Sequence, residues 1–261
     1  MRSRNKLTLP LVLILSLFGS SCRITRPPKP IPSATLLEVA RHYGQGTPSN
    51  KVLAAGLPAK PPKVSPQDLE IEQAYMSPIK LAFSQPNYDE LEKIAREARE
   101  SKGRTLGGKW KLVSFYDAIQ MTFITEHYDQ SDVNLYVDAT KAWVKARPES
   151  VTARISLAQA YVAYGRSARG TGYANTVSAT QWKVFYDSVA LAASTLVEAA
   201  QLKEKCPYWY ELMQNVARDQ GWDKSQAREL MELAVAFQPD FYHFYREYAY
   251  SLQTRWYGEE G

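Results

Sequence analysis

The side chains that could perform acid–base or metal chemistry are few and far apart in this sequence. His42, His127 and His243 stand outside HExxH and other metal-ligand spacings. Glu126 and Asp129 flank His127, and such a set could serve as weak metal ligands or as a general base. The sequence has no GxSxG elbow and no Walker loop. We therefore expect no catalytic residue, cofactor or bound metal, and an enzyme that uses Glu126, His127 and Asp129 stays an alternative.

One basic loop carries glycines next to arginines, in the sequence RSARGTGYANTVS. Arg166 and Arg169 offer guanidinium forks for a phosphate or a carboxylate. Gly170 and Gly172 could turn backbone N–H groups toward the same anion. In the structural alternative, which is favoured, the glycines adopt positive φ angles and Tyr173 folds back onto the helices. The loop is nevertheless the best local site candidate, for a ligand or for the alternative enzyme.

The N-terminus has the parts of a secretory signal. Three cations lie within the first six residues, an apolar run follows at 7–18, and small residues occupy 19–21 before Cys22. The run is too short for a bilayer core, which requires roughly 20 helical residues. Small residues before a cysteine resemble the lipobox of bacterial lipoproteins, whose cysteine thiol carries diacylglycerol, although Gly19 stands where leucine is commonest. An ordinary cleaved signal stays the alternative.

Lipidation of Cys22 has consequences for the rest of the chain. It would make residues 1–21 a signal peptide and leave Cys206 as a lone thiol. Arg23 follows Cys22, which resembles the sorting default of outer-membrane lipoproteins. We therefore expect a lipid-anchored protein of the bacterial cell envelope, at the periplasmic face of the outer membrane. Removing residues 1–21 lowers the net charge from +5 to +2, and so balanced a chain is not expected to bind nucleic acid.

Proline separates an expected tether from an expected helical domain. Nine of the 15 prolines lie between Pro27 and Pro66, so residues 22–66 are predicted to be an extended tether with one short helix at 35–43. Over residues 67–261, apolar residues recur at steps of three and four, which predicts helices. Pro78 is expected to kink or split the first of them. The expected helices are 67–83, 87–101, 108–127, 132–146, 149–165, 180–204, 207–219, 223–237 and 240–254.

Residue spacings typical of tetratricopeptide repeats recur along these helices. Small and apolar residues lie at the spacing of this repeat before and after Pro148 and Pro239. A third copy, which begins at Trp209, is less regular. The residues that carry the spacing are Ala227, Met231, Ala234, Pro239, Tyr245, Tyr248, Ala249 and Leu252; Trp143, Pro148, Arg154, Leu157, Ala158 and Tyr161; and Trp209, Leu212, Met213 and Val216. They predict an all-α fold of degenerate tetratricopeptide-repeat-like helical hairpins stacked as an α-solenoid. A helical bundle without repeats stays the alternative.

Several stretches between residues 80 and 261 also resemble a bacterial family, domain-of-unknown-function family 4034. The residues that carry this resemblance are Gly108, Trp110, Leu112, Phe115, Tyr116, Trp143, Pro148, Ser150, Ala153, Leu157, Ala158, Arg169, Gly170, Gly172, Tyr173, Pro207, Trp209, Gly221, Trp222, Arg255, Trp256 and Gly258. The resemblance implies a helical, repeat-like domain. It transfers no catalytic residue to this chain.

A stack of helix pairs forms a curved array, and the first helix of each pair lines its inner wall. The repeat spacing places amide, phenol, imidazole and guanidinium groups on that wall, namely Gln159, Tyr210, Gln214, Arg218, His243, Arg246, Tyr250 and Gln253. Amides can bond the backbone of an extended peptide, and arginines can pair with its carboxylates. The sequence therefore predicts a non-catalytic binding or scaffold module that grips a peptide or protein partner. A purely structural spacer is the third possibility.

Overall fold

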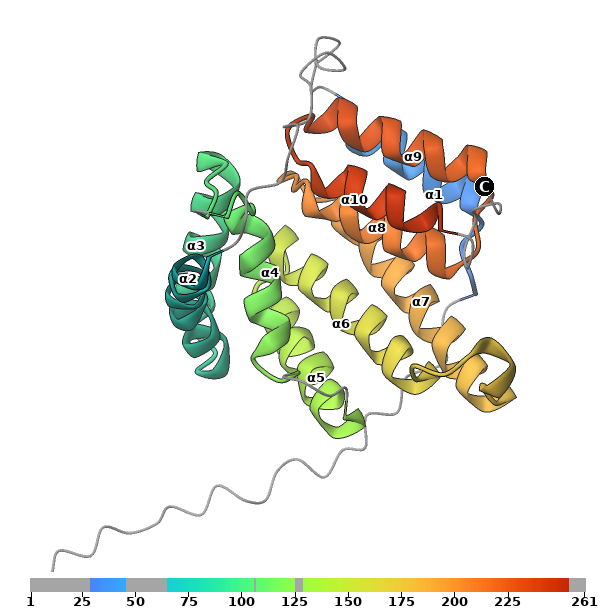
Figure 1. Ribbon diagram of the computed structural model, residues 1–261, viewed down its shortest axis with the longest axis horizontal. Helices are drawn as coiled ribbons and strands as arrows, with labels where there is room; N and C mark the ends of the chain where they lie inside the picture. The colour runs from blue at the N-terminus through green and yellow to red at the C-terminus, as the bar shows by residue number, and fades with distance from the viewer. Residues whose placement is uncertain (1–28, 46–64, 106, 125–128, 254–261) are drawn as a thin grey trace, which may run out of the picture.

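The computed structural model describes residues 29–45, 65–105, 107–124 and 129–253, and over these ranges the chain is all-α (Figure 1). It forms α1 (Ser33–Tyr43), α2 (Pro66–Ser84), α3 (Tyr88–Ser101), α4 (Lys111–Met121), α5 (Gln130–Ala146), α6 (Val151–Arg169), α7 (Ala179–Ala200), α8 (Tyr208–Asp219), α9 (Lys224–Phe237) and α10 (His243–Ser251), with a short 3₁₀ helix at Ala174–Thr176. None of these helices is long and apolar enough to cross a membrane.

The helix ends follow from local sequence. Ser65, Ser178 and Asp223 precede α2, α7 and α9, and each accepts a hydrogen bond from the backbone N–H three residues later. The side chain at that later position accepts one from the cap in return, which completes a capping box. Helix α2 runs through Pro78 as one helix, so the expected split is absent. Pro78 lies on the exposed side of α2, where water can bond the carbonyl that the proline ring leaves without a donor.

The cap of α7 offers a small, local test of this account. Replacing Ser178 by alanine removes the hydroxyl oxygen that accepts from the Gln181 N–H. It also removes the hydroxyl donor to the Gln181 side-chain oxygen. We expect a loss of about 1 kcal/mol in the free energy of unfolding, measured by urea titration. The control Ser178→Asp keeps an N-cap acceptor and should stay within about 0.5 kcal/mol of the wild type. Equal losses in both variants would contradict the capping role.

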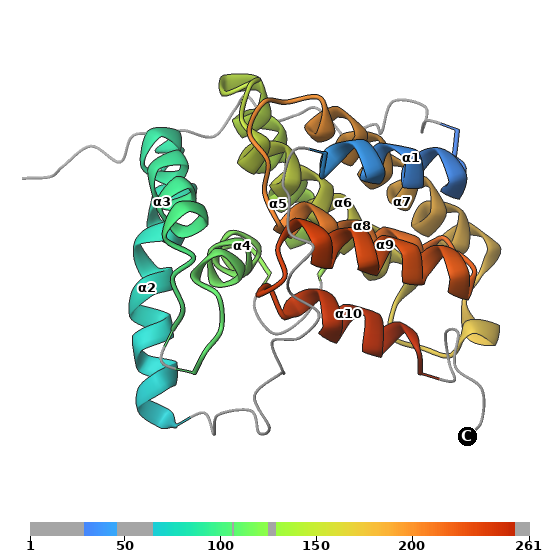
Figure 2. The same ribbon diagram turned by 90° about the horizontal axis from the view of Figure 1, so that it is seen from above.

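The helices stack in two layers, as the repeat spacing predicts. Helices α4, α6, α8 and α10 contact one another in that order, α7 and α9 each contact the two members beside them, and α5 packs against α6 (Figures 1 and 2). Helices α2 and α3 pack against each other and against α4 at one end of the array. The architecture is an α-solenoid of degenerate tetratricopeptide-repeat-like hairpins. Large aromatic side chains are fully buried between the layers, among them Trp110, Trp143 and Trp209.

Helix α1 belongs to this folded body, although it lies inside the segment predicted to be a tether. It packs against α7 and α9 and buries Leu36, Leu37, Ala40 and Tyr43 (Figure 2). Its four buried side chains follow the helical spacing of three and four, which gives α1 one apolar face. The short helix predicted at 35–43 is present at Ser33–Tyr43, and the proline pattern did not reveal its packing against α7 and α9.

Candidate binding face

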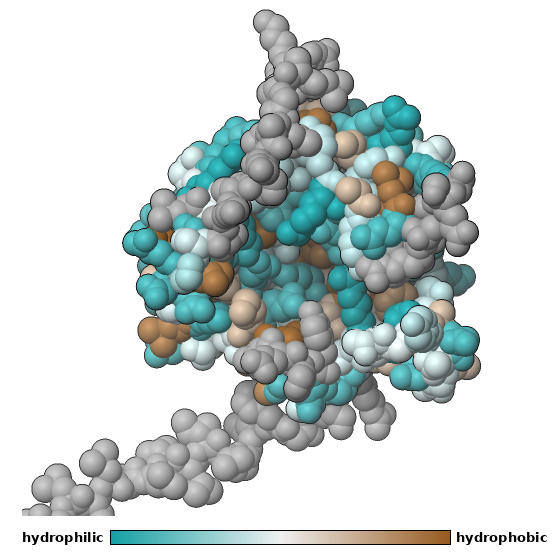
Figure 3. All heavy atoms as spheres, in the orientation of Figure 1, coloured by the Kyte–Doolittle hydropathy of each residue, from teal (hydrophilic) through white to brown (hydrophobic). Residues whose placement is uncertain are grey.

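The face of the array seen in Figure 1 is hollowed near its middle, and hydrophilic residues cover the hollow (Figure 3). Charged side chains from α4, α8 and α10 interact across this region. Lys109, just before α4, places its Nζ 2.6 Å from both Glu72 Oε1 and Asp117 Oδ2. Asp117 and Lys109 also act electrostatically on Glu211 of α8. We call Lys109, Asp117, Glu211, Arg246 and Glu247 the inner charged cluster.

Helices α8 and α10 meet through a chain of ion pairs in this cluster. Arg246 Nη2 lies 3.2 Å from Glu211 Oε1 and 3.1 Å from Glu247 Oε1. Glu247 Oε2 accepts a hydrogen bond from Arg218 Nη1 at 3.1 Å, and Arg218 Nη2 donates to Asn215 Oδ1 at 2.6 Å. Glu211 and Glu247 are 6% and 13% exposed at their side chains, whereas Arg246 is 57% exposed. The Arg246 guanidinium is thus the accessible end of an otherwise enclosed network.

Glu211 and His243 stand out because their polar atoms are buried without hydrogen-bond partners. These atoms are Glu211 Oε2 and both ring nitrogens of His243, with Nδ1 lying 3.7 Å from Glu211 Oε1. Burial raises the pKa of Glu211 well above its usual value, and the Glu247 carboxylate adds to the rise. Burial, together with the nearby Arg246 charge, lowers the pKa of His243 to about 3. Burial therefore favours the neutral form of both side chains, and His243 is neutral at pH 7 in the folded chain.

Opposite pKa shifts in neighbouring groups are also what general acid–base catalysis uses. Here the geometry does not favour that chemistry, because His243 is 1% exposed and Glu211 is 4% exposed. A substrate atom has to approach an acid or base to hydrogen-bond distance, and both side chains are enclosed by their neighbours. The pair is better described as a buried polar contact between α8 and α10.

Most of the residues predicted to line the inner wall are buried and do not face an open groove. Five are at most 7% exposed, namely Gln159, Tyr210, Gln214, Arg218 and His243. Helix α8 is surrounded by α6, α7, α9 and α10, so side chains on nearly all its faces are enclosed. Residue spacing along one helix assigns a face but not the number of neighbours that cover it. For this reason, the repeat spacing predicted that these residues line an open inner wall.

The buried members of that set hydrogen-bond between helices. Gln159 Nε2 donates to Gln120 Oε1 at 3.0 Å and to the Tyr208 hydroxyl at 3.3 Å. The Tyr210 hydroxyl donates to the Ala40 carbonyl at 2.7 Å, which joins α8 to α1. The amide of Gln214 donates to the Phe244 carbonyl at 3.2 Å. These contacts leave Arg246, Tyr250 and Gln253 as the predicted wall residues that remain accessible.

The glycine-bearing loop does not assemble the predicted anion site. Arg166 Nη2 points to Asn215 Oδ1 at 2.8 Å and to Asp219 Oδ2 at 3.0 Å, so its charge is already paired. Arg169 donates to the carbonyls of Gly170 and Gly172 and thereby holds the loop itself. Both arginines lie in the last turn of α6, where the helix dipole is negative and opposes an anion. The structural alternative predicts positive φ at both glycines, and Gly170 has a φ of +73° whereas Gly172 does not adopt a positive φ.

Tyr173 in this loop departs from the structural alternative. Its side chain is 86% exposed and does not fold back onto the helices. The loop residues around it are exposed as well. An exposed aromatic side chain of this kind needs a role other than filling the core.

The other predicted site residues are partly outside the described ranges. Glu126, His127 and Cys22 lie there, as does Trp256, so the alternative catalytic cluster and the lipid site are untested. Asp129 accepts a hydrogen bond from the Ser131 N–H and caps α5, and this contact lowers the pKa of its carboxyl. A capping role is structural. Over the described ranges, no three His, Cys, Asp or Glu side chains gather as they would around a metal ion.

Sequence reasoning missed Glu211, Asn215 and Glu247, which join the inner helices. A signal for two of them was present in α8. Polar residues recur there at helical spacing between apolar ones, at positions 211, 214, 215, 218 and 219. A polar stripe inside an apolar helix indicates a buried hydrogen-bond network between helices.

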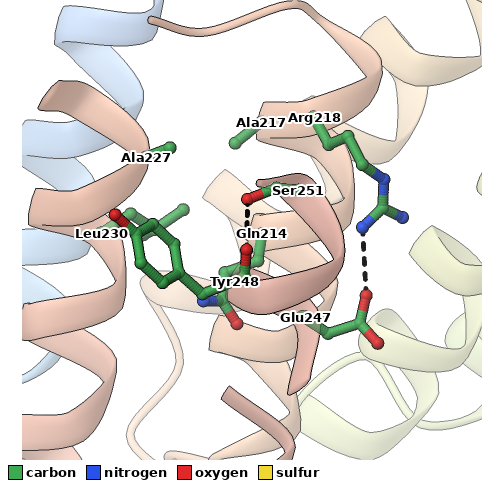
Figure 4. A pocket seen from close by; sticks show the side chains of 8 residues that line it. All are labelled: Gln214, Ala217, Arg218, Ala227, Leu230, Glu247, Tyr248 and Ser251. Atoms are coloured by element: carbon green, nitrogen blue, oxygen red, sulfur yellow. Dashed lines mark hydrogen bonds and ion pairs between the residues drawn. The ribbon is translucent and has the colours of Figure 1, made fainter. Parts of the chain in front are cut away.

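Two hollows in the surface differ in what they could hold. The hollow between α8, α9 and α10 encloses about 10 Å³, room for one water molecule at most (Figure 4). Figure 4 shows Arg218 paired with Glu247 on one side of it and Leu230, Ala217 and Ala227 on the other. A hollow of about 340 Å³ lies between α1 and α7 and is lined by Thr35, Glu38, Val39, His42, Tyr43, Ala200 and Gln201. Glu38 and His42 in it pair with each other at 2.9 Å.

These features define the candidate site by geometry alone. The inner charged cluster joins α8 to α10, its accessible end is Arg246, and Tyr250 and Gln253 of the predicted wall are also exposed. The resemblance to domain-of-unknown-function family 4034 stays a prediction. Comparison with protein-family models, with curated proteins and with solved structures finds no match to the chain.

Proposed function

We propose that this chain is a lipid-anchored protein of the bacterial cell envelope that holds a peptide or protein partner without transforming it. The observation that carries the proposal is the half-exposed Arg246 guanidinium, held between two enclosed carboxyl groups. An arginine fixed by its neighbours is pre-organised to receive a further carboxylate. Solenoid folds commonly bind extended partners on their inner surface. The lipid anchor is Cys22, at the periplasmic face of the outer membrane.

The charges on this face indicate the chemistry of the partner. Cations and anions alternate along the inner charged cluster, so the face has no large excess of either sign. A nucleic acid would require such an excess of cations. A polypeptide carries both signs and backbone amides, so it can match alternating charges. Tyr250 adds ring surface at low entropic cost, and its ring lies 4.9 Å from the Arg218 guanidinium.

Charge reversal at Arg246 tests this function. We expect Arg246→Glu to abolish the chemical crosslinking of a partner in envelope extracts, because the variant places three acids together and repels a partner carboxylate. The matched control is Arg228→Glu on α9, which also breaks an exposed arginine–glutamate pair. The control should retain the wild-type partner profile. Identical profiles for the wild type and both variants would reject the inner face as the binding site.

A structural spacer and an envelope enzyme would give different results in the same envelope extracts. A structural spacer would crosslink to no partner, in the wild type or in either variant. An envelope enzyme that uses the Glu126, His127 and Asp129 cluster would turn over an envelope substrate and lose that activity in His127→Ala. The Asp129 cap of α5 does not favour the enzyme, since its carboxylate is engaged by a backbone N–H.

A further inference from the structure

The tip of the α6–α7 hairpin projects aromatic side chains into solvent. We define the hairpin tip as residues 166–187. Tyr173 is 86% exposed in the loop, and Tyr186 is 51% exposed in the second turn of α7. Nearly every residue from 171 to 180 is exposed. Burial in the fold explains most aromatic residues of this chain, but it does not explain these two.

The contacts at the hairpin tip hold its rings in place. Trp182 stacks on Tyr186, with ring centroids 5.5 Å apart and planes 18° apart. The Arg169 guanidinium lies 5.2 Å from the centre of the Trp182 ring, on the side of the loop. Phe185, which is buried, packs edge-on against both Trp182 and Tyr186 and connects them to the core. The tip is therefore a pre-formed aromatic surface with a cation beside it.

The charge of the hairpin tip is positive. Its 22 residues contain Arg166, Arg169 and Lys183 against one acid, Asp187, and no acid occurs between residues 150 and 186. Lys183 pairs with Asp187 at 2.5 Å, and Arg166 pairs with Asp219 of α8. Arg169 interacts with a ring and two carbonyls. Exposed tyrosine and partly buried tryptophan beside cations are typical of protein surfaces at the membrane–water interface.

The hairpin tip lies at the same end of the molecule as the start of α1. Both are at the right-hand end in Figures 1 and 2, which are two perpendicular views. Helix α1 begins at Ser33, eleven residues after Cys22. Fully extended, such a segment spans at most about 40 Å. That segment, RITRPPKPIP before Ser33, carries three cations and no acid. An anchor at Cys22 would therefore hold this end of the domain close to the membrane surface.

We propose that the hairpin tip docks on the anionic lipid surface into which the Cys22 anchor inserts. The proposal rests on the proposed lipid anchor for the identity of that surface. Tyr173, Tyr186 and the edge of Trp182 enter the headgroup layer, where the net positive charge of the tip faces the anionic lipids. Docking orients the domain, because one covalent anchor on a short linker leaves rotation free, whereas a second contact point removes it.

Vesicle co-sedimentation of the mature chain from residue 22, with Cys22→Ser to remove the lipid, tests the hairpin tip directly. We expect binding to vesicles of phosphatidylglycerol and phosphatidylcholine at 3:7, and at least roughly tenfold weaker binding to pure phosphatidylcholine. The double variant Tyr173→Ser/Tyr186→Ser should weaken binding to the anionic vesicles about tenfold. The matched control Leu81→Ser/Leu135→Ser removes two residues that are each 56% exposed on α2 and α5, and it should bind as the wild type does.

The outcomes separate docking from the proposed anchor. Unchanged vesicle binding by the tyrosine variant, or no binding by the wild type, would overturn the docking surface. Sedimentation with peptidoglycan in place of vesicles, lost in the tyrosine variant, would identify the tip as a glycan site and also overturn it. The mass of Cys22 in the processed wild-type protein reports lipidation separately. An unlipidated Cys22 with vesicle binding intact would reject the anchor and leave the docking surface standing.

Discussion

Replacing Glu211 by glutamine is expected to remove a loss of stability that the wild-type chain shows above pH 6.5. Burial raises the pKa of Glu211, so the folded chain retains a proton that the unfolded chain releases above its ordinary pKa near 4.5. Folding then becomes less favourable by about 1.4 kcal/mol for each pH unit, until the pH reaches the raised pKa of the folded state. Glutamine keeps the neutral shape of the protonated acid and has no proton to lose in this range.

His243 shifts in the opposite direction and defines the lower limit of the window. Its pKa falls to about 3 in the folded chain, so the unfolded chain binds the extra proton between about pH 3 and 6.5 and stability falls as the pH is lowered. Between pH 4.5 and 6.5, the two proton differences cancel. Below this interval, the loss from His243 dominates, and above it the loss from Glu211 dominates. The pair therefore predicts greatest stability in mildly acidic solution.

Urea unfolding at pH 5.5, 6.5 and 8.0 measures this effect. The wild type should lose stability between pH 6.5 and 8.0, by at most about 1.4 kcal/mol for each pH unit, and Glu211→Gln should lose clearly less. Glu232→Gln is the matched control, because Glu232 also pairs with an arginine but is 59% exposed. It should retain the wild-type slope. The same alkaline slope in Glu211→Gln would show that Glu211 is ionised in the folded chain.

The apolar periodicity predicted the helices, and the repeat spacing predicted that they stack as a solenoid. Periodic apolar residues mark nearly every helix, and Asn87 and Ser150 serve as caps where α3 and α6 begin. Local signals of this kind act within one turn of helix, so a sequence expresses them directly. Helix α4 begins at Lys111, later than the 108–127 prediction, because Trp110 pairs with Arg104 in a β-bridge before the helix starts.

The candidate site was predicted less well, because burial depends on contacts between distant helices. Arg218 and His243 have the residue types of a binding wall, yet α8 and α10 enclose them against each other. Arg246 stays accessible only because it lies at the edge of that contact. The enclosed and the accessible residues occur at the same repeat spacing in the sequence. Only the three-dimensional packing distinguishes a groove residue from a residue that joins two helices.

The packing of helix α1 is another contact between distant helices that the sequence does not reveal. A substitution at this contact has the largest expected effect on the free energy of unfolding. The Tyr43 ring stacks on Trp209, with centroids 4.2 Å apart and planes 12° apart, and meets Tyr210 edge-on. Its hydroxyl accepts a hydrogen bond from the Cys206 N–H at 2.7 Å and lies 3.2 Å from the Cys206 carbonyl. We expect Tyr43→Ala to lower the free energy of unfolding by about 3–5 kcal/mol, because it leaves a cavity beneath α1.

Two further variants separate the ring from its hydroxyl and from general surface effects. Tyr43→Phe keeps the stack but leaves the buried Cys206 N–H without a partner, so we expect a loss of about 1–3 kcal/mol. Tyr173→Ala removes an exposed tyrosine and should change stability by less than about 0.5 kcal/mol. Urea titration monitored by tryptophan fluorescence measures all three, since Trp209 lies under the ring. A loss below about 1 kcal/mol in Tyr43→Ala would mean that α1 is detached in solution, and residues 22–66 would then form a tether as the proline pattern predicts.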